Sequence, residues 1–460
     1  MTYRKLIIRF ILLLLMVALA YGIYYAWFAF PLVSGYAAKN VCSCVFVEGR
    51  QEKTVRKEEL ADFPKNLASI DINWKDSSIT GTVFGFAKRK AIYRQGWGCT
   101  VVNEIPENIV RSQFFPPIEK KLLNSDSINW PYGDRIIDTL PKGLNKSKLD
   151  KGIDDAFIEK DSKNKVHTRA VLVLFKGQLV AEKYASGFDR NSRMLGWSVA
   201  KSFMNALTGI LIKEGRLKLS AAAVLPEWTD QKDPRYSITI EQLLQQTTGL
   251  DFREIYTGYS EVTNMLFNKA DMAGYTASRP LKYPPGSVFN YSSGNSNILS
   301  KIIRNTVGEK EYASFPYTSL FQKLGMNTAL LEPDASGTFV GSSYIFASAR
   351  DYARFGLLYY DDGVWNGERI LPEDWVKKTT TSPSANKLKN YGYQFWLNGM
   401  DKKDPSKRKY PDVPADMYYA DGYGGQDIYI IPSKGLVVVR LGVSVIDENN
   451  FLKNIVAAVE

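Results

Sequence analysis

The beginning of the chain is dominated by one long apolar stretch. Residues 10–30 contain no charged side chain, and a helix of that length, at about 1.5 Å per residue, spans the roughly 30 Å hydrocarbon core of a bilayer. Arg4, Lys5 and Arg9 precede it, and basic flanks stay on the cytoplasmic side. The pattern therefore predicts a basic cytoplasmic end at 1–9, a transmembrane anchor at 10–30 and a periplasmic or extracellular remainder.

A cleaved signal peptide is the alternative interpretation of this stretch. Cleavage would then follow the small residues Ala37 and Ala38. The apolar core of a signal peptide is usually about 7–15 residues long. The longer stretch found here favours an uncleaved anchor.

Beyond the anchor, apolar residues come in short runs. Strand-like runs stand at 45–47, 79–85 and 91–93, each bounded by polar residues or glycine. Proline and glycine at 116–117 and 131–133 then interrupt the pattern. We expect a small β-rich region over 39–130, followed by a linker.

From residue 138 onward, strand-like runs stand at both ends and helical periodicity fills the middle. A helix is expected over 147–159, and then strands over 169–175 and 178–184 around a Lys-Gly turn. Two more runs, 427–431 and 436–441, precede a closing helix over 448–459. Strands at both ends predict an α+β domain over 138–460, whose terminal strands share one antiparallel sheet flanked by helices.

The composition narrows the class of protein. Hydrophobic residues make up 45% and charged residues 23% of the 460 residues, which is typical of a globular chain. The net charge of +11 is spread along the chain, and no nucleic-acid-binding module is recognisable. An outward location permits disulfides, so Cys99 is expected to pair with either Cys42 or Cys44. No metal site is predicted, because the three thiols are far in sequence from the single histidine.

The catalytic possibilities are limited by what the sequence lacks. His167, the single histidine, stands just before a strand, and no Gly-x-Ser-x-Gly elbow, Walker loop or paired-histidine zinc motif occurs. A serine hydrolase without a usable histidine needs lysine or tyrosine as its base. That requirement points to the Ser-x-x-Lys motif, which occurs at Ser162, Ser198, Ser384 and Ser406.

Of these four serines, Ser198 is the one that begins an apolar segment with helical spacing. The apolar positions are Val199, Phe203, Ala206, Leu207, Ile210 and Leu211. Ser198 and Lys201 then lie one turn apart on the same polar face, and the N-terminus of a helix favours developing negative charge. The plainer alternative is that Ser198 caps a buried helix and Lys201 is solvated.

Five segments, in this order along the chain, carry a family resemblance. They read Gly196-Trp-Ser-Val-Ala-Lys-Ser202, Leu243-Leu-Gln-Gln-Thr-Thr-Gly-Leu250, Pro285-Gly-Ser-Val-Phe-Asn-Tyr-Ser-Ser293, Ala347-Ser-Ala-Arg-Asp-Tyr-Ala-Arg-Phe-Gly356 and Ala420-Asp-Gly-Tyr-Gly-Gly-Gln426. Together they resemble the class C-like serine β-lactamase/penicillin-binding hydrolases, especially the 6-aminohexanoate-dimer (nylon-oligomer) hydrolase group, although the second segment has Gln where histidine is common. The resemblance covers roughly residues 138–460 and implies a β-lactamase-like sheet with an all-helical subdomain.

The resemblance also implies a role for particular residues. Ser198 matches the acylated nucleophile, and Lys201 matches the lysine that takes its proton. Tyr291 matches the tyrosine that passes protons between the nucleophile and the leaving group. Ser293 occupies the Asn/Ser position of the same motif, where its hydroxyl can bond to Lys201 or to substrate.

The last motif and the loop after Thr-Thr-Gly-Leu concern substrate binding. The family pattern implies an oxyanion hole formed by the backbone N–H groups of Ser198 and of Tyr423, which follows Gly422. Where β-lactam-binding relatives have Lys-Thr-Gly or His-x-Gly, this chain has Ala420-Asp421-Gly422, so the cation that would hold a β-lactam carboxylate is absent. In the nylon-oligomer group the loop after Thr-Thr-Gly-Leu helps to cover substrate, which makes Tyr256 a candidate contact.

We therefore expect a membrane-anchored serine hydrolase that cleaves an amide or ester bond of a small molecule through an acyl-enzyme on Ser198. Neither cofactor nor metal is expected, and the partners are the substrate and, through residues 10–30, the membrane. One alternative is a D,D-peptidase or β-lactamase acting on peptidoglycan or β-lactams, which Asp421 disfavours. Another is a non-catalytic sensor or scaffold, which the presence of Ser198, Lys201 and Tyr291 disfavours.

Overall fold

The computed structural model describes residues 3–116, 125–159, 161, 165–222 and 225–459. The chain forms two compact units. Unit 1 comprises Met1–Arg94, Cys99–Arg111 and Arg253–Ala270, and unit 2 comprises Gln95–Gly98, Ser112–Phe252 and Asp271–Glu460. The chain therefore leaves unit 2 after Phe252, contributes a segment to unit 1, and returns to unit 2 at Asp271.

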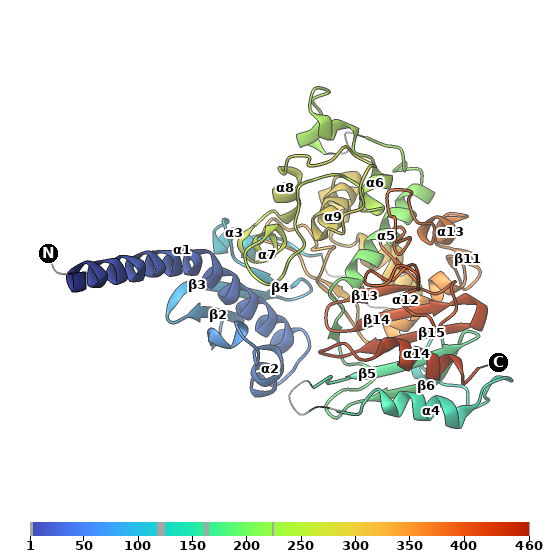
Figure 1. Ribbon diagram of the computed structural model, residues 1–460. Helices are drawn as coiled ribbons and strands as arrows, with labels where there is room; N and C mark the ends of the chain where they lie inside the picture. Colours follow the sequence, from blue (N-terminus) through green and yellow to red (C-terminus); the bar gives the residue numbers. More distant parts are fainter. Residues whose placement is uncertain (1–2, 117–124, 160, 162–164, 223–224, 460) are drawn as a thin grey trace. The chain divides into compact units, whose positions relative to one another are not determined.

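Unit 1 is built on one long helix, α1, and a four-stranded antiparallel sheet (Figure 1). α1 spans Tyr3–Phe46 and packs along β2 and β3. The strands, in sheet order, are β1 (Ala68–Asn73), β2 (Ser78–Val83), β3 (Phe86–Arg94) and β4 (Gly98–Val101). The predicted strand run at 91–93 is confirmed within β3, and that at 79–85 is confirmed up to Val83, where β2 ends and Phe84 and Gly85 form the turn.

The first part of α1 is exposed and strongly apolar. An 18-residue window of it has a mean hydropathy of 2.6, and none of that window is buried. Among the described residues, α1 is the helix that is long and apolar enough to cross a membrane, a criterion that a signal sequence also meets.

The last third of α1 belongs to the core of unit 1. Ala37 and Ala38 are fully buried among the apolar side chains of the sheet. β2 approaches the helix so closely that a Cβ on Gly81 would lie 2.4 Å from the Ser34 carbonyl oxygen. The strand predicted at 45–47 is wrong, because α1 continues to Phe46 and these residues close the helix against the sheet.

A disulfide joins the end of α1 to the sheet. Cys42 and Cys99 are bonded, with their Cα atoms 6.0 Å apart, which decides between the two pairings that the sequence left open. Cys44 lies outside the disulfide and is buried, and Arg50 Nη1 donates to its sulfur at 3.5 Å. Two short helices, α2 (Glu52–Glu59) and α3 (Glu107–Ser112), complete the N-terminal part.

The segment Arg253–Ala270 carries α7 (Glu261–Asn268), whose first turn is capped by the Ser260 hydroxyl. α7 packs against α1, where a Cβ on Gly35 would lie 3.0 Å from the Phe267 Cβ. Asn103 Nδ2 donates to the Phe267 carbonyl at 3.0 Å. These contacts make a loop of the expected hydrolase region part of unit 1.

Unit 2 contains a six-stranded antiparallel sheet of order β12-β13-β14-β15-β5-β6. Its strands are β5 (Ala170–Phe175), β6 (Gln178–Tyr184), β12 (Trp396–Leu397), β13 (Tyr418–Gly422), β14 (Gln426–Ile431) and β15 (Leu436–Leu441). β15 pairs with β5, which confirms that strands from the two ends of the domain share one sheet. Every residue of β5, β14 and β15 is buried, and this explains their continuous apolar runs, because strands covered on both faces do not alternate.

Helices cover both faces of this sheet (Figure 1). α4 (Lys146–Asp155) and α14 (Glu448–Val456) share one core with Tyr419 and Tyr429. α5 (Val199–Lys213) and α12 (Ala349–Tyr360) share the core on the other face. The expected α+β architecture is confirmed, although α4 and α14 end earlier than the sequence predicts.

Another part of unit 2 is helical, and in it α6, α8 and α10 pack against α9. The remaining elements are α6 (Ile240–Leu244), α8 (Met272–Ala277), α9 (Ser293–Val307), α10 (Glu309–Tyr312), α11 (Gln322–Leu324), α13 (Trp375–Thr379), β7 (Met194–Leu195), β8 (Leu330–Leu331), β9 (Ile345–Ala347), β10 (Val364–Trp365) and β11 (Glu368–Arg369).

Candidate active site

Ser198 stands between the short strand β7 and helix α5. Gly196 N donates to the Ile345 carbonyl at 2.8 Å, and a Cβ on Gly196 would lie 2.5 Å from the Tyr352 hydroxyl, so the close approach requires glycine. Trp197 has a φ of 48°, a left-handed conformation that is rare for a bulky residue and that marks local strain. This sharp turn presents Ser198 at the start of α5, where the first N–H groups of a helix have no intrahelical partner.

Lys201 is buried directly beside the serine. Its side chain is almost inaccessible, at 1% exposure. Its Nζ donates to Ser198 Oγ at 3.0 Å, to Ser293 Oγ at 3.1 Å and to the Ser342 carbonyl at 2.9 Å. Ser198 makes no side-chain capping bond to α5. These contacts contradict the alternative in which the serine only caps the helix and the lysine is solvated.

The ring of Tyr291 lies beside the same lysine. Its centroid is 4.9 Å from Lys201 Nζ, within the range of a cation–π contact. Two further rings hold it, since its centroid is 5.7 Å from that of Tyr391 and 5.2 Å from that of Trp396. Sequence reasoning did not single out Tyr391 or Trp396; the aromatic run Tyr391-Gly-Tyr-Gln-Phe-Trp396 is the signal that marks them.

Gln246 fixes the segment that carries Tyr291 and Ser293. It is fully buried and has a φ of 61°. Its Oε1 accepts from Ser292 N at 3.1 Å and from Asn295 Nδ2 at 2.8 Å, and its backbone carbonyl accepts from Asn290 N at 2.9 Å. The glutamine that stands in place of the common histidine is therefore the main polar support of this turn.

The end of β13 approaches the turn that carries the nucleophile. A Cβ on Gly422 would lie 2.1 Å from the Gly196 carbonyl oxygen, so only glycine fits there. The rings of Trp197 and Tyr423 lie 5.8 Å apart. Both observations bring Gly422 and Tyr423 to the turn that precedes Ser198, as the expected oxyanion hole with two N–H donors requires.

Asp421 lies on the other face of the same strand. Side chains alternate along a strand, and Ala420 belongs to the core around α5 whereas Tyr419 belongs to the core around α14. Burial raises the pKa of Asp421 to about 6, although Lys409 opposes the shift from 3.9 Å away and the side chain keeps 32% exposure. Ala420, at the position of the missing cation, is therefore the residue that disfavours β-lactam substrates, because the Asp421 carboxylate lies on the other face of the strand.

The other sequence candidates are placed as follows. Tyr256 lies in unit 1, where its hydroxyl donates to Glu254 Oε1 at 2.7 Å, while the other predicted site residues lie in unit 2. Ser384 and Ser406 are exposed, and Ser162 lies outside the described residues. Among the residues with described positions, no group of three or more His, Cys, Asp or Glu side chains could hold a metal ion.

Known proteins are similar to this chain in sequence. Residues 153–445 match the sequence model of the beta-lactamase family. A 6-aminohexanoate-dimer hydrolase of Paenarthrobacter ureafaciens is 27% identical over 300 residues, which cover 60% of this chain and 72% of that protein.

Solved structures share the fold. A putative 6-aminohexanoate-dimer hydrolase from Bacillus anthracis has a TM-score of 0.54 at 22% identity, covering 70% of this chain and 85% of its own. A penicillin-binding protein homologue from Caulobacter crescentus has a TM-score of 0.52 at 15% identity, covering 70% of this chain and 99% of its own. The expected β-lactamase-like α+β fold is thereby confirmed.

Proposed function

Because the chain belongs to the beta-lactamase family, we propose that it is a serine hydrolase that cleaves an amide or ester bond through an acyl-enzyme on Ser198. The observation that carries the proposal is the buried Lys201 ammonium, 3.0 Å from the Ser198 hydroxyl. The relative from Paenarthrobacter ureafaciens is named a hydrolase of the 6-aminohexanoate dimer, which supports a small-molecule substrate.

The proposed reaction has two acyl-transfer steps. Ser198 Oγ attacks the substrate carbonyl carbon and gives its proton to the neutral form of Lys201, which Ser293 and Ser342 hold in place. The tetrahedral oxyanion is stabilised by the N–H groups of Ser198 and Tyr423. Tyr291 passes the proton to the leaving amine or alcohol, and water then attacks the ester on Ser198, releasing the acid and restoring the hydroxyl.

We also propose that residues 10–30 anchor the chain in a membrane. The exposed, apolar part of α1 supports a span, and its continuation into a buried core supports an uncleaved one. Cleavage after Ala38 would cut the helix inside the core of unit 1 and upstream of the disulfide at Cys42. The disulfide itself is typical of an oxidising, outward-facing compartment.

The nucleophile assignment is tested with a fluorophosphonate probe on the full-length, detergent-solubilised chain. Ser198→Ala is expected to abolish labelling, whereas Ser384→Ala, the matched change at an exposed Ser-x-x-Lys serine, leaves it intact. Labelling that persists in Ser198→Ala overturns the assignment.

The reaction class is tested by turnover of p-nitrophenyl esters and amides alongside exposure to fluorescent penicillin. Rapid ester or amide turnover without retained penicillin is the expected result. Stable penicillin labelling of Ser198 with no turnover would instead indicate a penicillin-binding function.

A further inference from the structure

Several side chains of unit 1 contact α1 where the predicted membrane span ends. The ring of Tyr259 lies 5.2 Å from that of Phe28, and the ring of Phe84 lies 5.7 Å from that of Phe30. The loop 255–260 and the turn between β2 and β3 therefore both meet the helix at its last intramembrane turn.

Large apolar side chains on these two loops are exposed. We call them the apolar collar: Phe84 (65%), Phe86 (71%), Ile255 (51%), Tyr256 (49%) and Tyr259 (44%). Large exposed apolar side chains often mark interaction sites, and aromatic side chains are enriched where proteins cross the membrane–water interface. The proposed membrane span ends beside these side chains, so a lipid surface is the partner that they would meet.

The rest of unit 1 extends along α1 away from that level. Trp74, at the turn between β1 and β2, packs on Phe46, with ring centroids 5.5 Å apart. Phe46 follows Phe30 by about 24 Å along the helix at 1.5 Å per residue. The turn of the β2–β3 hairpin at Phe84 therefore lies at the proposed membrane surface. The opposite end of β2, beside Trp74, lies far from it.

Arg89 lies a short distance beyond the collar. It pairs with Gly81 in the sheet, and Gly81 touches α1 at Ser34. Ser34 lies about 6 Å beyond Phe30 along the helix, which is the depth of the polar headgroup layer, roughly 5–8 Å thick on each side of the hydrocarbon core. The proposed span would thus bring the part of β3 that carries Arg89 to the level of lipid phosphates.

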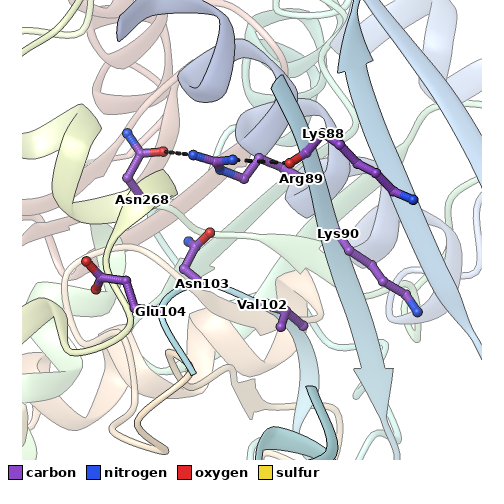
Figure 2. A pocket seen from close by; sticks show the side chains of 7 residues that line it. All are labelled: Lys88, Arg89, Lys90, Val102, Asn103, Glu104 and Asn268. Carbon is purple, nitrogen blue, oxygen red and sulfur yellow. Dashed lines mark hydrogen bonds between the residues drawn. The ribbon is translucent and has the colours of Figure 1, made fainter. Parts of the chain in front are cut away.

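Arg89 points into an open pocket of about 400 Å³ (Figure 2). Figure 2 shows it directed toward Asn268, whereas the side chains of Lys88 and Lys90 leave the strand on the other side. Arg89 Nη2 donates to Asn268 Oδ1 at 3.2 Å and Nη1 donates to the Lys88 carbonyl at 3.1 Å, which leaves a second N–H group on each of these nitrogens. The guanidinium keeps donors available for an anion.

Two of the charged side chains that line the pocket with Arg89 have ion-pair partners. Lys90 pairs with Asp76 and Glu107, and the pocket's carboxylate, Glu104, pairs with Lys269. No carboxylate lies within 4.0 Å of Arg89 in the described part of unit 1, and desolvation lowers its pKa. A partly buried, uncompensated guanidinium favours a phosphate, which it can bind through two N–H groups.

We propose that unit 1 sits on the outer face of the membrane, with the apolar collar in the interface and the Arg89 pocket holding the phosphate of an anionic phospholipid headgroup. This rests on the proposed anchor at 10–30. It gives unit 1 a role that the hydrolase chemistry does not require.

The position of the apolar collar relative to the membrane is tested by fluorescence quenching. The full-length chain is reconstituted in nanodiscs whose lipids carry a spin label near the headgroup, which quenches fluorophores at that depth. A fluorophore on Phe84→Cys is expected to lose most of its emission, and one on Lys75→Cys, in the exposed turn at the opposite end of the sheet, is expected to lose none. If the fluorophores at both sites keep equal emission while the chain resists alkaline extraction, the membrane-facing collar is excluded and the proposed anchor is retained. Release of the chain by alkaline extraction overturns both, and neither result bears on probe labelling at Ser198.

The pocket is tested by titrating the solubilised full-length chain with short-chain phosphatidylglycerol, short-chain phosphatidylcholine or inorganic phosphate. Phosphatidylglycerol is expected to bind most tightly, and Arg89→Gln to weaken that binding about tenfold or more. Lys53→Gln, at an exposed lysine of α2, serves as the matched control, and Arg89→Lys, which keeps the charge, is expected to fall between wild type and Arg89→Gln. Equal binding of inorganic phosphate, or equal binding of the two lipids, overturns the assignment of an anionic headgroup.

Discussion

At the scale of single residues, the chemistry depends on where the Lys201 ammonium is held. Lys201→Met keeps an unbranched side chain as far as Cε but removes Nζ, which is both the base and the donor to Ser198 and Ser293. We expect ester turnover to fall by about 100-fold or more, the usual contribution of a positioned base. Ser293→Ala removes one of the three acceptors around Nζ and is expected to cost about tenfold.

Both variants are compared by kcat and KM on the same p-nitrophenyl ester, with thermal unfolding as a check on the fold. A Lys201→Met enzyme with wild-type kcat would exclude Lys201 as the base. A Ser293→Ala loss that appears only in KM would assign Ser293 to substrate binding.

Asp421 makes stability depend on pH. Its pKa in the folded chain is about 6, whereas an unfolded Asp titrates near about 3.9. Between these values the folded state binds more protons, so the free energy of unfolding falls as pH rises through that window and stays lower above it. In Asp421→Asn, the melting temperature should decrease less between pH 4 and pH 7 than in the wild type. An unchanged decrease would show that the Asp421 carboxyl does not control this pH dependence.

The sequence predicted the residues that carry the candidate reactive groups. It did not predict the residues that hold these groups in position through hydrogen bonds. Ser198, Lys201 and Tyr291 stand in local motifs of fixed spacing, which a sequence displays directly. Gln246 and the Ser342 carbonyl support the site through contacts between segments far apart in the chain. A backbone carbonyl has no sequence signature, and Gln246 was visible only as a departure from the family's usual histidine.

At the scale of secondary-structure elements, the proposed oxyanion hole depends on the approach of β13 to the turn before α5. Gly422→Ala would place a methyl group 2.1 Å from the Gly196 carbonyl oxygen, so the strand end must move away from Ser198. We expect probe labelling and ester turnover to fall by about 100-fold, as on loss of one oxyanion donor. Gly152→Ala in α4, where the new methyl group meets the Asn454 side chain at 3.2 Å, is the control and should leave turnover unchanged.

Element prediction succeeded where the hydrophobic pattern is local. β5, β14 and β15 are continuous apolar runs because both faces of their sheet are covered. The extension of α1 to Phe46 was missed, because residues 39–130 were predicted to be a β-rich region with a strand at 45–47. Lys39 is buried and donates to Ser43 Oγ one turn later at 2.9 Å, so the helix satisfies its own polar groups and continues into unit 1.

At the scale of the whole molecule, the two units are interleaved along the chain. The sequence places Arg253–Ala270 inside the hydrolase region, yet α7 packs on α1 through contacts more than 200 residues apart, as between Gly35 and Phe267. No periodicity within 253–270 carries information about such a partner. The division into units therefore required the structure.

The orientation of the whole chain is testable through its three cysteines. If the part after residue 30 faces an oxidising compartment, Cys42 and Cys99 are bonded and only Cys44 remains a thiol. The chain from native membranes, denatured without reductant, should then take up one polyethylene-glycol maleimide, and the reduced chain should take up three. Uptake of three before reduction would place this part in a reducing compartment and contradict the proposed topology, whereas an N-terminal tag that remains on the full-length band would exclude cleavage after Ala38.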